Sequence, residues 1–470
     1  MSLSRFSGQF IVPGRHDPPR QRWGVVIERW KNHAQWRAGR YSWVRMTNPN
    51  APALPAGSGS INSFSFFNAV SFQIVLGAPV VLYAKSLGAS SFVLGVIAGL
   101  TPLLNILQFV AARLLHRTGY RKLVLAGWGT RTIFTCCIAL LPLVPGLGVA
   151  QKLWILIGSL FAFNLLRGFA SGAWLPWLTA IVPENVRGRF LSRDQAFMHM
   201  GCLVALLVSS VIMTGQPDPA RYAAVFGIGA LAALVSLWFI RRIPEGHSAE
   251  EMRRSAVPVP WVAMMKHAPF ARLLVFSLLY STVIGGLGVF TVEFLAVKEK
   301  FGENTILFLG ALAFVGALGG LALTGPWLDE TGSKPWLARA LLLFEVAVAG
   351  WLLLAGGLLP AWNSVVAALN LLGGLAGAMF GVASTRIVMG SVPVMGRNHF
   401  FALYAVLTGL ALGASPMAWG AMLDFLGPLD IAFGDFHVNR YTVYFAAILA
   451  LALWVRWLAA RLHEGVPPEA

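Results

Sequence analysis

The chain has 470 residues, of which 57% are hydrophobic and only 12% are charged. A soluble domain carries about 25% charged residues, so the composition excludes an ordinary soluble protein. The three cysteines form no CxxC pair or Cys/His cluster, and no GxxxxGK[ST] phosphate loop occurs. We therefore expect no metal, no cofactor and no ATP hydrolysis by the chain itself. The net charge is +17, but its position along the chain matters more than its sum, and we expect no nucleic-acid partner.

Apolar runs of about 20 residues, long enough to cross a bilayer as helices, recur between residues 62 and 461. There are twelve such runs, six in each half of the chain: 62–84, 92–112, 123–144, 152–181, 195–215, 221–240, 270–296, 304–324, 336–356, 361–385, 399–422 and 440–461. The pattern predicts an all-α integral membrane protein with one six-helix bundle over 62–240 and another over 270–461. Segment 241–269 is the expected linker, and 462–470 is a short tail.

Residues 1–61 are polar and basic. They lack a charged segment followed by an apolar core, so we expect no cleaved secretory signal. Two interpretations of this tail stay open. Trp23, Ile27 and Trp30 share one helical face amid Arg and Lys, which is typical of a helix lying on an anionic membrane surface. The alternative is a disordered tail, and translation from Met46 would remove most of it.

The distribution of Lys and Arg predicts the orientation, because cytoplasmic loops are enriched in these residues. With the N-terminus in the cytoplasm, the cytoplasmic segments hold 28 of the 36 basic residues and the external loops hold 6. Arg131 and Arg167 are the remaining two and lie within spans. We therefore expect a multi-pass protein of the cell (inner or plasma) membrane with both termini in the cytoplasm.

Two short motifs recur in the same order in both halves. Gly119 and Gly332 lie in similar polar loops, 213 residues apart. Pro183-Glu-Asn-Val-Arg-Gly-Arg-Phe190 and Pro393-Val-Met-Gly-Arg-Asn-His-Phe400 follow at an offset of 210. Two motifs that repeat at nearly one period indicate a duplicated half, so the two bundles are expected to be pseudo-symmetric.

Polar residues within the spans are the candidates for function, because a charge in hydrocarbon costs at least about 2.5 kcal/mol. Arg167 shares one helical face with Asn164, Ser171 and Trp174. The repeat offset places small or polar residues on the same face of the tenth span, which predicts a cavity between the halves. Substrate-binding or coupling roles are predicted for Arg167, Asn164, Ser171, Trp174, Asn68, Gln73, Asn105, Gln108, Tyr280, Asn370 and Ser384.

Three further charged residues have candidate roles in proton movement. Glu345 and Arg131 occupy nearly equivalent repeat positions, and Glu293 lies near the external end of the seventh span. Burial favours the protonated form of a carboxyl group, so either acid is suited to carry a proton. Packing or placement at the membrane interface is the alternative role.

The motif loops predict a gate on the cytoplasmic side. Gly119 and Gly332 suit tight turns with positive φ, and Asp329 can accept hydrogen bonds at a helix N-terminus. Contacts of these loops across the halves would hold this side closed. The predicted gate residues are Arg117, Gly119, Arg121, Gly325, Asp329, Gly332, Lys334, Arg187, Arg189 and Arg397.

These motifs resemble those of the major facilitator superfamily. Gly325-x-x-x-Asp329-Glu330-x-Gly332-Ser333-Lys334 matches the family's loop between helices 8 and 9, whereas the first copy at 112–122 lacks its opening Gly and its Asp. Pro183-x-x-x-Arg187-Gly188-Arg189 resembles the loop that follows helix 4 in many members. Arg167 resembles the helix 4 arginine of proton-coupled exporters, but the Gly-Pro signature of drug antiporters is absent from the fifth span. The resemblance covers about residues 62–461 and assigns no subfamily.

The resemblance implies a secondary active transporter, not an enzyme, that moves a small organic solute by alternating access and functions as a monomer. Because Arg167 is the expected cavity charge, an organic anion or a polar neutral solute fits better than a cation. Proton coupling stays open. The alternatives are a drug or metabolite exporter working as a proton antiporter, and a non-transporting membrane sensor or scaffold of the same fold. The expected partners are the solute, the lipid bilayer and, if coupling exists, protons.

Overall fold

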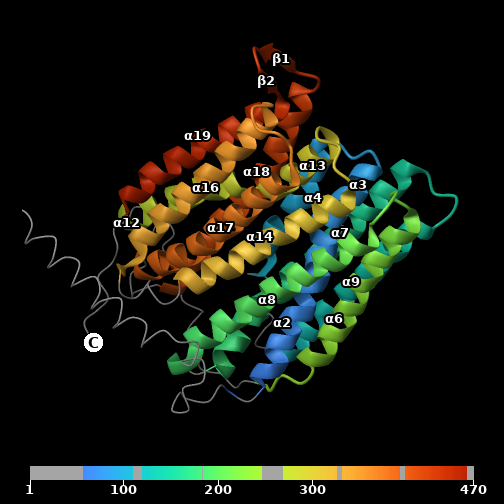
Figure 1. The fold of residues 1–470 in the computed structure, drawn as a ribbon. Helices are drawn as coiled ribbons and strands as arrows, with labels where there is room; N and C mark the ends of the chain where they lie inside the picture. The colour runs from blue at the N-terminus through green and yellow to red at the C-terminus, as the bar shows by residue number, and fades with distance from the viewer. Residues whose placement is uncertain are drawn as a thin grey trace, which may run out of the picture. The chain divides into compact units, whose positions relative to one another are not determined.

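A computed structural model describes residues 55, 57–108, 119–182, 184–245, 268–324, 331–391 and 397–462 (Figure 1). Side chains at 175, 176, 179, 180, 184, 185, 187–189, 389–391 and 397–402 are not described. The helices of the first half are α2 (Ser58–Leu76), α3 (Ala78–Ser86), α4 (Ser91–Leu104), η2 (Asn105–Leu107), α6 (Tyr120–Leu140), η3 (Leu141–Leu143), α7 (Val149–Ile181), α8 (Glu184–Ile212) and α9 (Pro219–Ile240).

The second half contains α12 (Ala268–Ile284), α13 (Leu287–Val297), α14 (Glu303–Thr324), α16 (Ser333–Ala355), α17 (Asn363–Ser391), α18 (Arg397–Leu426), β1 (Asp430–Phe433), β2 (Phe436–Asn439) and α19 (Arg440–Ala460). Eleven helical stretches of the described chain are long and apolar enough to span a membrane, and Ser91–Leu107 is a shorter apolar helix at the second predicted span. The predicted helical membrane fold is therefore confirmed. The first helix begins at Ser58, slightly before the predicted start of the first span.

Two of the predicted spans are each broken in the middle, where we expected continuous helices. The first span breaks at Gly77, between α2 and α3, and the seventh breaks at Gly285 and Gly286, between α12 and α13. A Cβ atom on Gly77 would lie 2.4 Å from the carbonyl oxygen of Gln73, and Gly286 has a φ of 82°. Glycine is therefore required at both breaks. Their offset of 209 residues matches the repeat.

Close helix pairs join the two halves. α4 packs along α18, α8 packs along α14, and α3 contacts α13. Glycines allow the approach of α4 to α18, since a Cβ atom on Gly95 would lie 2.2 Å from the Pro416 carbonyl oxygen. A Cβ atom on Gly420 would lie 2.3 Å from the carbonyl oxygen of Ser91. Small residues permit such backbone contact in lipid, where van der Waals packing drives helix association.

A β-hairpin between α18 and α19 was not predicted. β1 and β2 pair antiparallel, with Phe433 opposite Phe436, so the turn is the dipeptide Gly434-Asp435, in which Gly434 has a φ of 61°. The Gly-Asp pair between alternating apolar residues was the available sequence signal. We call the end of the helices that carries this hairpin, α3 and α13 the hairpin end, and the opposite end the motif end (Figure 1).

Several sequence features lie outside the described residues, and their predicted structure stays a prediction. These are the basic tail up to residue 54, Arg117, Gly325, Asp329 and the linker residues 246–267. The bundle boundaries at 240 and 270 stay a prediction. The aligned glycines Gly119 and Gly332 begin α6 and α16 with φ values of 75° and 79°. Both therefore adopt the conformation that a tight turn requires of glycine.

The α4–α18 contact yields a stability prediction. Gly95→Ala places a methyl group against the α18 backbone, which cannot move aside as a side chain would. We expect a loss of about 1–3 kcal/mol, seen as a lower midpoint of thermal unfolding of the purified protein. Gly158→Ala is the control, because its Cβ atom would meet nothing within 4 Å. Equal stability of the two variants would contradict the close contact.

Candidate functional site

A cavity of about 400 Å³ lies between the two halves at the broken helices. Its walls come from α2, α3, α8, α13, α14, α16 and α17, and most of its surface is apolar. Gly77 and Gly286, the residues at the two breaks, both line it. Discontinuous helices at equivalent positions of two repeats are typical of binding sites near the centre of a membrane protein.

The helices that restart after each break begin at this cavity. Ala78, the first residue of α3, and Leu287, the first residue of α13, line it. The first N–H groups of a helix lack acceptors within the helix, and the helix dipole makes that end partly positive. Two helix N-termini at one cavity therefore favour a negatively charged or strongly accepting group.

Few polar side chains line the cavity. Gln73 and Asn370 were predicted from the sequence, and Thr291 was missed. The amide nitrogen of Asn370 donates to the carbonyl oxygen of Val366 at 3.0 Å. The apolar walls include Phe314, Phe344, Trp351, Leu206 and Leu369. A ligand that fills the cavity must therefore have an apolar body with a small number of polar atoms.

Arg131 lies inside the first half and is only 1% exposed. One guanidinium nitrogen, Nη2, donates to Oδ1 of Asn68, which also accepts from Nε1 of Trp128 at 3.2 Å. The guanidinium carbon lies 4.8 Å from the centre of the Trp128 ring and 5.1 Å from that of Phe163. Its other terminal nitrogen, Nη1, is buried without a hydrogen-bond partner among the described residues.

Arg167 is a second cation in the same bundle. Its Nη1 donates to Oδ1 of Asn105 at 3.0 Å, and its guanidinium carbon lies 5.1 Å from the centre of the Phe72 ring. Phe72 precedes the cavity residue Gln73 along α2, but Arg167, the expected cavity charge, is not among the residues that line the cavity, and neither are Arg131, Asn68 and Asn105. Within the described part of the chain no carboxylate pairs with Arg131 or Arg167. The first half thus contains two cations that neutral side chains hold in place.

The other predicted residues have local partners. The buried Asn164 accepts from Oγ1 of Thr101 at 2.8 Å, which joins α7 to α4. Ser171 and Ser384 donate to carbonyl oxygens of their own helices.

Trp174 packs on Phe64 with ring centres 4.8 Å apart, and Tyr280 stacks on Phe380 with ring centres 3.6 Å apart. Gln108 packs against α7 through its backbone, near Gly172. None of these side chains is among those that line the cavity.

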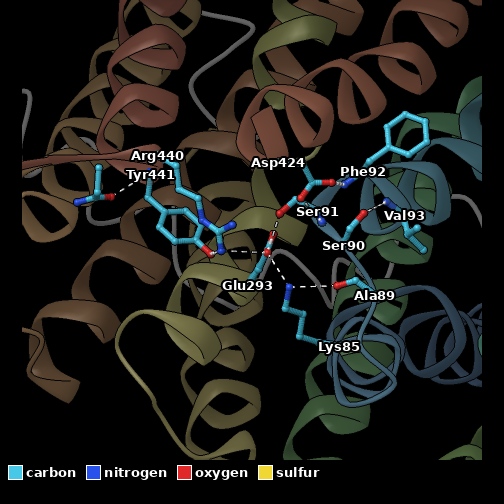
Figure 2. Close-up of polar contacts among 11 residues, drawn as sticks. Lys85, Ala89, Ser90, Ser91, Phe92, Val93, Glu293, Asp424, Arg440 and Tyr441 are labelled. Atoms are coloured by element: carbon cyan, nitrogen blue, oxygen red, sulfur yellow. Dashed lines mark hydrogen bonds and ion pairs between the residues drawn. The ribbon is translucent and has the colours of Figure 1, made fainter. Parts of the chain in front are cut away.

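A polar network joins the halves at the hairpin end (Figure 2). Glu293 of α13 is fully buried, and its Oε1 accepts from Nζ of Lys85 at 2.9 Å and from Oγ of Ser91 at 2.7 Å. Lys85 lies in the last turn of α3 and Ser91 begins α4, so both donors belong to the first half. Arg440 of the second half lies 3.6 Å from the same oxygen. Oε2 of Glu293 has no partner among the described residues.

Asp424 makes a second connection close by. Its two carboxylate oxygens accept from the backbone N–H groups of Ser91 at 2.9 Å and Phe92 at 2.8 Å, at the N-terminus of α4. An anion at a helix N-terminus is stabilising.

Two further hydrogen bonds join the halves nearby: Tyr222 donates to Glu303, and Oγ of Ser210 donates to the Asn304 carbonyl oxygen at 2.7 Å. The two halves are therefore closed against each other at the hairpin end.

The remaining charged candidates lie elsewhere. Glu345 of α16 is 5% exposed, and its Oε1 lies 3.1 Å from Nε of Arg456 in α19, so it forms an ion pair within the second half. Arg121 donates to the carbonyl oxygen of Arg241 within the first half. Lys334 lines a separate groove. The side chains of Arg187, Arg189 and Arg397 are outside the described residues, so the cytoplasmic gate stays a prediction.

Comparison with known proteins identifies the family. The family model described as Major Facilitator Superfamily matches residues 61–369. The chain belongs to the major facilitator superfamily. It is therefore a multi-pass membrane transporter and not an enzyme, as the sequence predicted. The matched region includes the cavity breaks at Gly77 and Gly286 as well as Arg131 and Arg167.

Solved structures of this superfamily have a similar fold. A nucleoside transporter matches with a TM-score of 0.66 at 13% identity, covering 86% of this chain and 99% of its own. A D-xylose–proton symporter matches with a TM-score of 0.65 at 14% identity, covering 87% and 97%. A POT family transporter in complex with 5-aminolevulinic acid matches with a TM-score of 0.66 at 12% identity, covering 87% and 96%.

One curated relative is similar in sequence. A probable 4-methylmuconolactone transporter of Cupriavidus pinatubonensis is 23% identical over 282 residues, which are 58% of this chain. The match spans 63% of the length of that relative. Together these likenesses establish the fold and the transporter family, and they leave the substrate of this chain to be inferred from its own residues.

Sequence reasoning missed the most informative features of the site. The paired breaks were visible as Gly77-Ala78-Pro79 and Gly285-Gly286-Leu287-Gly288 near equivalent repeat positions, which is a known signal for a binding site. Lys85, Ser91 and Asp424 were not singled out, because their importance depends on contacts across the halves. Glu293 was selected as a proton carrier, and the structure shows in addition that it joins the two halves.

Glu293→Gln tests the connection at the hairpin end. The amide keeps the shape but removes the charge that holds Lys85, and a hydrogen bond to a charged group contributes about 1.5–3 kcal/mol. We expect the cavity to open to that end more often. In protein lacking native cysteines, Asn370→Cys should react at least about tenfold faster with a membrane-impermeant thiol reagent added to vesicles from the side of the hairpin end. Glu345→Gln, which alters a pair within one half, is the control, and equal rates in both variants would contradict the assignment.

Proposed function

We propose that this transporter moves a small organic anion with an apolar body, by alternating access to the cavity between its halves. The cavity at the paired breaks of α2–α3 and α12–α13 carries this proposal. Its volume of about 400 Å³ is suited to a compact metabolite rather than to a large drug or peptide. Its mainly apolar wall is suited to a ring or a short hydrocarbon chain.

The charge of the substrate is inferred from three features. The N-termini of α3 and α13 meet the cavity, and each favours a negative group. Arg167 is a cation in the first half that contacts Phe72, which precedes the cavity residue Gln73 along α2. No carboxylate among the described residues lines the cavity or pairs with Arg131 or Arg167. A carboxylate can pair with a guanidinium in a two-pronged geometry that a neutral solute cannot reproduce.

The sequence relative supports the same class of substrate. It is named as a probable transporter of 4-methylmuconolactone. A muconolactone is a small acid in which a lactone ring carries the carboxylate, so it combines one negative group with a compact body of low polarity. We use it as the first compound to test, together with simpler monocarboxylates.

The network at the hairpin end is suited to act as one of the two gates. It is built from separate side chains on α3, α4, α13 and α18, so it can break without unfolding any helix. Binding of substrate between α3 and α13 would shift the balance between closed and open states, if the substrate prefers one of them. A proton on Glu293 would weaken its connection to Lys85 and would thereby couple this gate to proton movement.

Transport of labelled acids into proteoliposomes tests the substrate class. Arg167→Ala should lower the transport efficiency for a carboxylate by about 10- to 100-fold, because a hydrogen bond to a charged group contributes about 1.5–3 kcal/mol. Arg193→Ala is the control. It also removes a cation that lies over an aromatic ring, that of Phe197 in α8, but Arg193 does not line the cavity, so transport should be retained. Intact carboxylate transport by Arg167→Ala would contradict the role of Arg167. Transport of cationic dyes instead would favour the exporter, and ligand binding without any transport would favour the sensor.

The coupling ion is tested in the same vesicles with a pH indicator inside. Proton symport predicts that the interior becomes more acidic when the acid enters, and that a proton ionophore abolishes accumulation. Glu293→Gln should then transport without proton movement, whereas Glu345→Gln should behave as the unmodified protein. Proton movement that persists in Glu293→Gln would exclude Glu293 as the proton carrier. Protons moving opposite to the solute would favour an antiporter.

A further inference from the structure

A second hollow lies at the motif end, on the second half of the chain. It is a groove of about 700 Å³ between the beginning of α12, the beginning of α16 and the end of α19. Arg272, Lys334 and Arg461 contribute three positive charges to it, and Val275, Leu458 and Leu462 contribute apolar wall. Within the part of the chain that the structure describes, no acidic side chain lines the groove and no carboxylate pairs with any of its three cations.

The residues on the surface of α19 indicate the depth at which we expect this groove to lie in the membrane. Trp454, Trp457 and Arg461 are spaced by three and four residues, so they share one helical face. Both tryptophans are about half exposed, and the Arg461 guanidinium carbon lies 3.5 Å from the centre of the Trp457 ring. Tryptophan and basic residues gather where lipid headgroups meet the hydrocarbon. The cations of the groove therefore lie at headgroup level.

The apolar part of the groove continues toward the hydrocarbon. Val275 lies on α12 one turn beyond Arg272, and its side chain is 48% exposed. Trp454 lies further along α19, away from Arg461. A molecule that places a phosphate among the three cations can therefore lay an acyl chain along α12 and α19. Free phosphate would use the cations alone.

A groove at the hairpin end provides a contrast. It has about 400 Å³ and is lined by Lys298, Glu299, Asp430 and His437. Its charges are of both signs, so it offers no uniform attraction to an anion. The uniformly positive lining therefore distinguishes the motif-end groove from the groove at the hairpin end.

We propose that the motif-end groove binds the phosphate headgroup of an anionic phospholipid from the surrounding bilayer. Arg272, Lys334 and Arg461 hold the phosphate, while Val275 and the exposed α19 tryptophans contact an acyl chain. The bound lipid joins the ends of α12, α16 and α19. This site is distinct from the cavity between the halves and requires only that the chain spans a membrane, so it does not depend on which solute is transported.

Lipid binding is measured on the purified full-length protein in detergent. The protein is titrated with phosphatidylglycerol or phosphatidylcholine, and bound lipid is counted by native mass spectrometry. Each basic residue near a membrane surface contributes about 1 kcal/mol to the binding of anionic lipid. The triple variant Arg272→Gln, Lys334→Gln, Arg461→Gln should therefore bind phosphatidylglycerol at least about tenfold more weakly, with phosphatidylcholine binding unchanged. Equal binding of the two lipids by the unmodified protein would overturn the proposal.

Two controls separate this site from general charge. The variant Arg193→Gln, Arg241→Gln, Arg242→Gln removes three cations that lie in α8 and directly after α9. The guanidinium carbon of Arg242 also lies 3.4 Å from the centre of the Trp238 ring, as that of Arg461 lies over Trp457. This variant should keep phosphatidylglycerol binding, and a loss equal to that of the first variant would overturn the proposal. If the first variant unfolds, the single changes Arg272→Gln and Lys334→Gln are compared instead, and unchanged binding in both would overturn it.

The source of the phosphate is settled by competition. Inorganic phosphate is added to the protein loaded with phosphatidylglycerol, at rising concentration and constant ionic strength. A lipid site predicts that the lipid stays bound, because the acyl chain contributes to its affinity. Displacement of the lipid by free phosphate at equal concentration would show that the groove recognises the phosphate alone and would overturn the lipid assignment.

Discussion

In the hydrocarbon of a bilayer, every backbone N–H and C=O group must find its partner inside the protein. The spans that the structure describes meet that requirement as helices, and interruptions are tolerated only where the backbone is buried or lines a cavity. Gly77 and Gly286 are the places where this chain interrupts its first and seventh spans, and both line the cavity between the halves. The cavity thus lies where the backbone is not held in a continuous helix, and each half contributes one such break.

The closed hairpin end follows from a different balance. A buried carboxylate such as Glu293 is costly unless partners surround it, and its partners Lys85 and Ser91 come from the other half of the chain. If the two halves separated at this end, Glu293 would be exposed to water, and water would replace Lys85 and Ser91 as its hydrogen-bond partners. The network is therefore a connection that can be exchanged for water, whereas the close contact of Gly99 with Gly413, deeper along α4 and α18, has no such substitute. This difference is suited to a structure that opens at its ends and stays packed in its middle.

The sequence predicted the part of the fold that depends on local pattern. Runs of apolar residues predicted the spans, and the repeated glycines Gly119 and Gly332 predicted positive φ at two helix starts. Among the site candidates, Gln73 and Asn370 line the cavity, while Arg167 and Arg131 lie within the first half. Their partners could not be predicted, because a hydrogen bond such as that of Asn68 with Arg131 joins positions 63 residues apart. The pairing of Lys85 with Glu293, 208 residues apart, could not be predicted either, because helical periodicity relates only residues that are close in sequence.

The central claim is that the two halves close alternately at the hairpin end and the motif end around the cavity. It is tested most directly by measuring distances between paired spin labels in the reconstituted protein, with one pair at Gln216 and Leu358 at the hairpin end and one at Lys122 and Ala338 at the motif end. These four residues are exposed and take no part in the polar network. On adding the transported acid, the account predicts that a longer distance appears at the hairpin end while the distance at the motif end shortens. Distances that stay fixed, or that lengthen at both ends together, would contradict it.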